Sequence, residues 1–214
     1  MSSDPAAFVR ANTLLAAPPL VPEITLHLAT EVTPLWQATE AVLEQQQLPP
    51  PYWAFAWAGG QALARHILDH HAIVAGRKIL DIGAGSGLVA IAAAKAGAAA
   101  TAAEPDPFAC AAIALNAVAN DVVVKIERAD LIGTARTWDV VLAGDMCYER
   151  PLAERLIPWL RRLAGEGALV LLGDPGRAYL PGSGLEELAR YTVPTSLELE
   201  DRLSRETVVW RLSP

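Results

Sequence analysis

The sequence predicts an α/β protein with a doubly wound, mostly parallel seven-stranded sheet and a short N-terminal extension. Segments with strand-like and helix-like patterns alternate from residue 60 onward, which is typical of a parallel sheet covered by helices. A glycine-rich turn joins the first of these strands to a helix. The segment 138–143 is mostly apolar, as strands buried on both faces tend to be.

Composition narrows the class of protein. The chain has 214 residues, of which 52% are hydrophobic, and this favours one folded domain with an extension. The net charge of −7 argues against a general nucleic-acid binder, because phosphate contacts need a basic face. Two cysteines cannot form a disulfide framework, and the chain has no CxxC or HExxH motif, so we expect no metal site. The apolar stretch 88–103 contains Lys95 and is mostly alanine, so it does not predict a membrane span.

Residues 1–50 differ from the rest of the chain. Proline-rich pieces flank a predicted strand at 23–28 and a predicted helix at 34–46. We expect this segment to form a lid or an appendage on a main domain that spans residues 51–214. Its apolar N-terminus lacks a preceding basic segment and is broken by prolines, so we expect a cytoplasmic protein. We also expect a monomer.

The elements of the main domain follow from local patterns. Apolar pairs at i,i+4 predict a helix at 61–70, and Asp106-Pro107 predicts the cap and first turn of another. Further helices are predicted at 88–96 and 151–163, with a short one after residue 173. The predicted strands cover 77–82, 98–103, 122–127, 138–143, 168–172, 191–199 and 206–212, the last two as a hairpin.

The glycine turn between the first strand and its helix predicts a ligand site. Gly83, Gly85 and Gly87 allow a tight turn and close approach of a ligand to the backbone, and the helix amides favour a negative group. Leu88 stands where a dinucleotide-binding loop has its third glycine. With Asp81, the pattern DxGxGxG resembles motif I of the seven-strand S-adenosylmethionine-dependent methyltransferases. A carboxylate there suits the ammonium group of that cofactor; the alternative is a purely structural turn.

Two further acidic residues follow neighbouring strands. Glu104 ends the second strand, where a carboxylate can accept hydrogen bonds from both ribose hydroxyls of a nucleotide-like cofactor. Asp106 competes for this role, but it is better explained as a helix cap. Asp130 follows the third strand and is expected to meet the adenine amino group; the alternative is an ordinary loop aspartate.

The fourth strand ends in GDMCY, where the chemistry is expected. Ligands in such sheets bind beyond the carboxyl ends of the strands, so Asp145 and Tyr148 would face the acceptor of the reaction. A carboxylate suits an amine acceptor, because it can orient an ammonium group and relay its proton. The alternatives are a buried turn aspartate and a packing role for Tyr148. Cys147 has no evident base partner and is assigned to packing.

Aromatic and turn residues complete the predicted site. Trp53 and Trp57 are expected to form a wall that covers the cofactor or substrate, for which a cation–π contact to a sulfonium is suitable. Phe55 is assigned to the core. Asp174 and Arg177 follow the fifth strand in a Pro-Gly turn, where they would touch a protein substrate or brace the site.

The combined segments resemble a narrower family. PYWAFAWAGGQALARHILD, KILDIGAGSGLVAIAAAKAGA, EPDPFACAAIALNAVAN, GDMCYE and GDPGR are similar, in this order, to the electron-transfer flavoprotein β-subunit lysine methyltransferases. The resemblance runs from about residue 20 to the C-terminus. Cys147 departs from it, since the family often has phenylalanine there; Glu149 is a conservative replacement.

The resemblance implies both a cofactor and a protein substrate. It implies S-adenosylmethionine contacts at Asp81, Gly83, Gly85, Glu104 and Trp57, and a lysine channel shaped by Asp145 and Tyr148. It also implies that lysines in the flavoprotein's recognition loop are methylated, which would reduce its docking to partner dehydrogenases. A looser resemblance, to the methyltransferases of ribosomal protein L11, keeps a ribosomal protein as a second candidate substrate. A small-molecule amine is a third.

Overall fold

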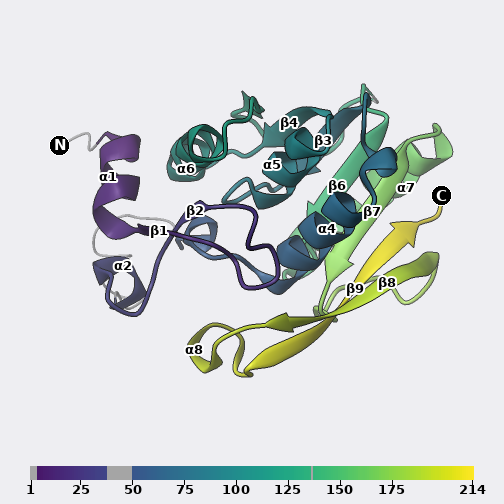
Figure 1. Cartoon of the computed structure of the whole chain (residues 1–214). Coiled ribbons are helices and arrows are strands. Elements are labelled where there is room, and N and C mark those ends of the chain that lie inside the picture. Colours follow the sequence, from purple (N-terminus) through teal and green to yellow (C-terminus); the bar gives the residue numbers. More distant parts are fainter. Residues whose placement is uncertain (1–3, 38–49, 136) are drawn as a thin grey trace.

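A seven-stranded sheet lies at the centre of the molecule, in a computed structural model that describes residues 4–37, 50–135 and 137–214 (Figure 1). The strand order is β5-β4-β3-β6-β7-β9-β8. The first five strands of this order are parallel, and β9 runs antiparallel to both β7 and β8. The predicted fold class, including the closing hairpin, is confirmed. The strands are β3 (Lys78–Ile82), β4 (Ala99–Ala103), β5 (Lys125–Glu127), β6 (Val140–Gly144), β7 (Leu169–Asp174), β8 (Leu185–Pro194) and β9 (Ser204–Leu212).

Helices cover both faces of this sheet. The helices of the main domain are η1 (Tyr52–Ala54), α4 (Ala58–Asp69), η2 (His71–Ile73), α5 (Leu88–Lys95), α6 (Pro107–Ala119), α7 (Arg150–Gly165) and α8 (Leu197–Glu200). One core cluster packs α4, α5 and α6 against one face, and a second packs α7 against the other (Figure 1). The inner strands β3 and β6 are therefore buried on both faces along nearly their whole length, which explains their continuous apolar sequence.

The described part of the N-terminal segment packs on the main domain. It holds α1 (Pro5–Asn12), β1 (Leu14–Ala16), β2 (Leu26–Leu28) and α2 (Pro34–Gln37). Two buried asparagines, one in α6 and one at its C-cap, hold the backbone of this segment. Asn116 Oδ1 accepts from the His27 amide at 2.7 Å, and Asn120 Oδ1 accepts from the Thr25 amide at 3.0 Å. The predicted boundary at residue 50 stays a prediction, as does the choice between lid and appendage.

Several predicted elements need correction. The helix expected at 34–46 is described only at Pro34–Gln37, and its remainder lies outside the described residues. The strand expected at 191–199 starts and ends earlier, at 185 and 194, because residues 195–203 form the tip of the β8–β9 hairpin around α8. No helix lies between β7 and β8 in the part of the chain that is described, and α1 and β1 were not predicted. Among the described helices, none is long and apolar enough to cross a membrane.

The strand topology determines which edge of the sheet is expected to hold the site. Because β3, β4, β5, β6 and β7 are parallel, their carboxyl ends meet at one edge of the sheet. The N-terminus of α4 lies against the ends of β6 and β7 through glycines. A Cβ atom on Gly59 would lie 2.1 Å from the carbonyl oxygen of Gly173, and one on Gly144 would lie 2.9 Å from Cα of Gly60. Only glycine permits this approach, and it brings the first turn of α4 to the edge.

Candidate active site

A cavity of about 530 Å³ opens at the carboxyl ends of β3, β4 and β6. Most of the predicted site residues line it, although they come from widely separated parts of the chain. They are Trp53, Trp57, Gly83, Gly85, Glu104, Asp130, Asp145, Tyr148 and Arg177. The apolar side chains of Ile82, Ile132, Met146 and Leu152, which sequence reasoning did not single out, line it as well.

The glycine turn after β3 has the shape that its sequence predicts. Gly83 and Gly85 adopt left-handed backbone angles, with φ of 65° and 52°. A Cβ on Gly83 would lie 2.2 Å from Sδ of Met146, so glycine is needed for Met146 to cover the turn. At Gly85 the nearest atom to such a Cβ is Cα of Trp53 at 3.8 Å, which leaves the loop open toward the cavity. The turn therefore offers its backbone to a ligand.

Glu104 stands at the end of β4, inside the cavity. Its Oε2 accepts from the amide of Gly85 at 3.1 Å, and its Oε1 accepts from the amide of Asp106 at 3.3 Å. Burial raises the pKa of Glu104, while these two amides act in the opposite direction. Asp106 caps α6 by accepting from the Phe108 amide at 2.8 Å, as expected from its Asp-Pro sequence. Two backbone amides thus hold the Glu104 carboxylate in place at the wall of the cavity.

Three predicted contact residues do not line the cavity. Asp81 is buried, and its Oδ2 accepts from the Ala90 amide of α5 at 3.0 Å; burial raises its pKa to about 8. Gly87 has φ of 80° and faces Ile113, so it is needed for the backbone and for packing. Asp174 accepts from the amides of Gly176 and Arg177 and shapes their turn. For Asp174 these hydrogen bonds agree with the expected bracing role. The cofactor contacts expected of Asp81 and Gly87 stay predictions.

Asp145 occupies a strained and buried position at the end of β6. Its φ of 58° is uncommon for a residue with a side chain, and such outliers cluster at functional sites. Oδ2 accepts from the Gly60 amide in the first turn of α4 at 2.9 Å. Oδ1 accepts from Nη2 and Nε of Arg177 at 2.7 and 3.1 Å. Burial raises the pKa of Asp145 to about 6, although Arg177 acts to lower it, so the group is ionised at neutral pH.

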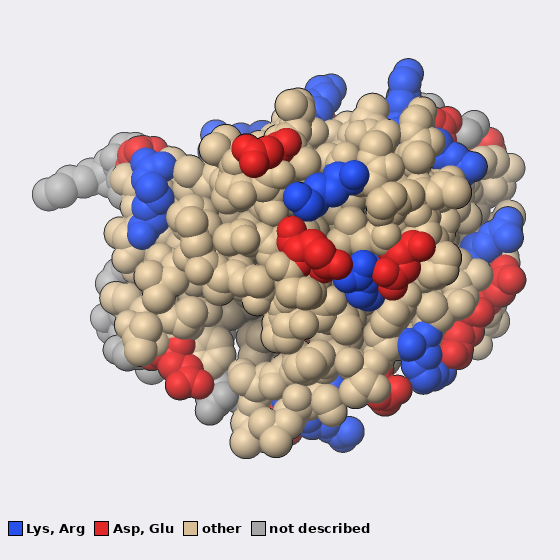
Figure 2. Space-filling view, in the orientation of Figure 1, with Lys and Arg blue, Asp and Glu red and all other residues tan. Residues whose placement is uncertain are grey.

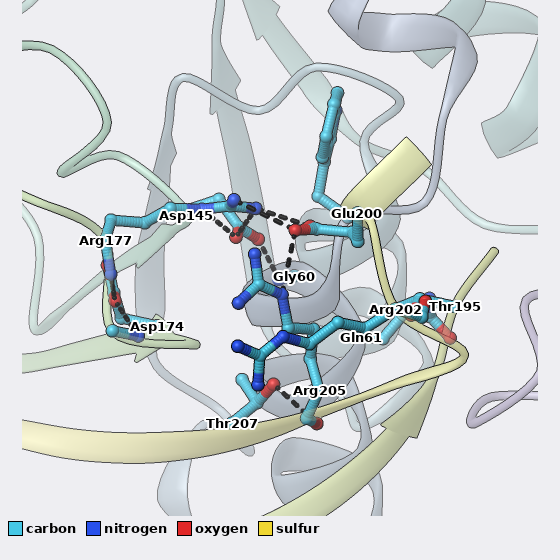
Figure 3. Close-up of polar contacts among 12 residues, drawn as sticks. Gly60, Gln61, Asp145, Asp174, Arg177, Thr195, Glu200, Arg202, Arg205 and Thr207 are labelled. Atoms are coloured by element: carbon cyan, nitrogen blue, oxygen red, sulfur yellow. Dashed lines mark hydrogen bonds and ion pairs between the residues drawn. The ribbon is translucent and has the colours of Figure 1, made fainter. Parts of the chain in front are cut away.

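A buried ion-pair network continues beyond Arg177 (Figure 3). Arg177 lies between Asp145 and Glu200, whose Oε1 it approaches to 2.6 Å with Nη2. Arg205 adds a second cation at 3.2 Å from Oε2 of Glu200. The guanidinium pKa of Arg177 is raised because two carboxylates surround it, despite its burial. Sequence reasoning missed Glu200, since its only sequence signal is an acid in a polar hairpin.

Aromatic rings line the mouth of the cavity. Tyr148 meets Tyr52 edge-on at 5.6 Å between ring centroids, and Tyr52 meets Trp57 in the same way at 6.0 Å. The guanidinium of Arg177 lies 5.7 Å from the Trp57 ring centroid, a cation–π distance. Burial raises the pKa of the Tyr148 hydroxyl to about 12, so it stays protonated. Together these rings give the cavity an aromatic wall beside Asp145.

Asp130 also lines the cavity and follows β5, the strand at the edge of the sheet, three strands away from β6 and Asp145. Its Oδ2 pairs with Nη2 of Arg155 at 2.5 Å, and its Oδ1 accepts from the Ile132 amide at 3.0 Å. Despite partial desolvation, these contacts lower the pKa of Asp130, so it is a stable hydrogen-bond acceptor. The described residues hold no cluster of histidine, cysteine or acidic side chains suited to a metal ion.

Comparison with known proteins places this architecture in a family. The electron transfer flavoprotein beta subunit lysine methyltransferase of Xenopus laevis is 37% identical over 221 residues, covering 98% of this chain and 87% of the relative. Its human counterpart is 35% identical over 220 residues, with 97% and 82% covered. The chain belongs to this family. The family resemblance and the prediction of a protein-lysine methyltransferase are confirmed.

The other matches are to a broader set of methyltransferases. A family model described as ribosomal protein L11 methyltransferase (PrmA) matches residues 62–172, the span from α4 to β7. The solved T. thermophilus 16S rRNA N2 G1207 methyltransferase, in complex with AdoMet and guanosine, has a TM-score of 0.57 at 15% identity, covering 94% of this chain and 50% of that one. Ribosomal protein L11 methylase from Lactobacillus delbrueckii has a TM-score of 0.51 at 20% identity, with 75% and 81% covered. These structures support the fold alone.

Proposed function

We propose that this chain transfers the methyl group of S-adenosylmethionine to lysine side chains of the electron-transfer flavoprotein β subunit. The observation that carries the proposal is the cavity itself, which both Glu104 and Asp145 line. The family supplies the substrate class, because the relatives are named for this lysine methylation. An amine acceptor fits an ionised carboxylate at the end of β6.

The cofactor fits residues of this chain. The open turn at Gly85 would accept the amino-acid part of S-adenosylmethionine, Glu104 its ribose hydroxyls and Asp130 its adenine amino group. Trp57 and Trp53 would cover it from the side of η1. When bound, the cofactor supplies an activated methyl group on a sulfonium. The chain's own contribution is to hold the acceptor amine in line and to keep bulk water out.

The acceptor end is suited to orient an ammonium group. A carboxylate offers about four lone-pair sites. Oδ2 of Asp145 uses one of them for the Gly60 amide, and Oδ1 uses two for Nε and Nη2 of Arg177. The remaining site can accept from a lysine that enters between Tyr148 and Tyr52. A free lysine has a pKa of about 10.4, so it must release a proton to solvent water before its nitrogen can accept the methyl group. Because Asp145 is already engaged by Arg177, we assign it to orienting the amine and Tyr148 to shaping the channel.

The proposal extends to partner and location. Acidic and basic side chains are interspersed on the face shown in Figure 2, and the net charge of the chain is −7. These features favour a protein partner over a nucleic acid. We include a cytoplasmic location and a monomeric state in the proposal; sedimentation of the purified protein and cell fractionation test them.

The direct test is methyl transfer measured by intact mass. The purified protein is incubated with S-adenosylmethionine and with the flavoprotein β subunit, or separately with ribosomal proteins. We expect additions in multiples of 14 Da, the mass that one methyl group adds, on flavoprotein lysines. Asp145→Ala should abolish them, whereas Glu187→Gln, a matched change in an exposed ion pair with Arg190, should not. Labelling of a ribosomal protein alone would replace the proposed substrate, and labelling of neither would indicate a small-molecule amine.

A further inference from the structure

A buried carboxylate at the tip of the β8–β9 hairpin reaches the site from outside the parallel sheet. Glu200 is the last residue of α8, and its side chain is only 1% exposed. Its two oxygens accept from Nη2 and Nη1 of Arg177 at 2.6 and 3.1 Å. Burying a carboxylate costs free energy unless it is paired and hydrogen-bonded, so this residue depends on its partners.

Arg177 is shared between two carboxylates. Its Nε and Nη2 donate to a single oxygen of Asp145, and its Nη1 and Nη2 donate to Glu200 (Figure 3). Asp145 and Arg177 alone would form a neutral pair. With Glu200 included, the three side chains carry a net charge of −1. The outer cation, Arg205, is 29% exposed, so solvent screens it more strongly than the buried members.

We propose that Glu200 is a positioning residue for the acceptor end of the site. It holds the Arg177 guanidinium in place and balances its charge, so that Asp145 keeps a negative field toward an incoming ammonium group. The inference deepens the proposed function and rests on it for the identity of that ammonium. It assigns a role in the reaction to the hairpin tip, which lies outside the residues matched by the L11 methyltransferase model.

The charged groups around Asp145 determine whether its pKa rises or falls when Glu200 or Arg205 loses its charge. Arg177 and Asp174 face it from the end of β7, the Gly60 amide from α4, and the Cys147 thiol from its own turn. Arg177 lowers the pKa of Asp145, and Asp174 raises it. Loss of the Glu200 charge would leave Arg177 acting on Asp145 alone, which lowers the pKa of Asp145. Loss of the Arg205 charge would strengthen Glu200 as a competitor for Arg177, which raises it.

The first test follows the Asp145 carboxyl carbon by NMR during a pH titration and needs no substrate. In Glu200→Gln, which keeps an acceptor but removes the charge, we expect the pKa of Asp145 to fall by about one unit, the scale of a nearby charge in a partly screened site. In Arg205→Gln it should rise. Glu187→Gln, in an exposed pair on the same hairpin, should leave it unchanged. An unchanged or raised pKa in Glu200→Gln would overturn the proposal.

The second test measures methyl transfer to the flavoprotein β subunit at saturating S-adenosylmethionine. We expect Glu200→Gln to raise KM for the protein substrate about tenfold and to leave the Kd of S-adenosylmethionine unchanged. The control Glu187→Gln should have the same KM and Kd as the natural protein. An unchanged KM contradicts the proposal. If the natural protein methylates no flavoprotein lysine, the proposed function fails while the NMR titration still decides the role of Glu200. If Glu200→Gln does not fold, Arg205→Gln decides it, and an unchanged Asp145 pKa there counts against it.

Discussion

The close packing of α4 on the sheet makes Gly59→Ala a severe test of how the site is assembled. A Cβ on Gly59 would lie 2.1 Å from the carbonyl oxygen of Gly173 and 2.6 Å from Oδ2 of Asp145. An ordinary carbon–oxygen contact is longer than the first of these two distances by more than about 1 Å. The nearest obstacle is backbone, so the first turn of α4 must move away from β7. That movement would break the 2.9 Å hydrogen bond from the Gly60 amide to Asp145.

The expected magnitude follows from two contributions. Overpacking a well-packed site costs about 1–3 kcal/mol, and a buried carboxylate that loses an amide donor costs about 1–3 kcal/mol more. We expect Gly59→Ala to lower the free energy of unfolding by about 3 kcal/mol. For a chain of this size that corresponds to a fall in Tm of roughly 6–12 °C. Methyl transfer should fall by about tenfold or more even in the folded fraction, since Asp145 would be misplaced.

Gly60→Ala is the matched control, one residue along the same helix. Its Cβ would meet only Leu88 and Val89, at 4.0 Å, and its amide would still donate to Asp145. Because alanine is the better helix former, we expect Gly60→Ala to be neutral or to stabilise the fold by up to about 1 kcal/mol. Thermal and urea unfolding, with methyl transfer measured on the same samples, check both variants. Equal stability of the two variants would refute the argument that this contact needs glycine.

Three further predictions concern the cofactor, the acceptor and the loop. Glu104→Gln should weaken S-adenosylmethionine binding about 10- to 100-fold in calorimetry, since it removes charged hydrogen bonds worth about 1.5–3 kcal/mol; an unchanged Kd would exclude Glu104 from the cofactor site. The kcat/KM for the protein substrate should drop as pH falls through about 6, because the raised pKa of Asp145 lets it lose its charge there; Asp145→Asn should remove that limb of the profile. Gly87→Ala should lower the free energy of unfolding by about 1–3 kcal/mol, because its φ is 80° and its Cβ would lie 3.1 Å from Ile113; Gly182→Ala, where nothing lies within 4 Å, should have little effect in the same urea titration.

Local patterns were sufficient for much of the fold and for most of the residues that line the cavity. The β3-turn-α5 unit, the Asp-Pro cap of α6 and the inner strands each depend on a few neighbouring residues, so one chain carries their signal. Glu104 and Asp145 were found in the same way, because each directly follows a buried strand and parallel strands end at one edge. The resemblance to the family rested on these same short segments.

Other features were decided only by packing between distant segments. The carboxylate of Asp81 precedes the glycine turn, yet α5 captures it through the Ala90 amide and so turns it away from the cavity. The strand β8 was misplaced because it is an edge strand with an alternating, partly exposed face, which gives a weak apolar pattern.

The sequence by itself determined which residues could do the chemistry, because strand ends and glycine turns are local properties. The tertiary structure alone decided how those residues are charged and held. Asp145 and Arg177 are 32 residues apart, and Arg177 and Glu200 are 23 apart. Their pairing depends on strand order and on glycine-mediated contact between α4 and the sheet. Such pairing is a property of the folded chain, since burial gives charges their strength only after the elements have packed.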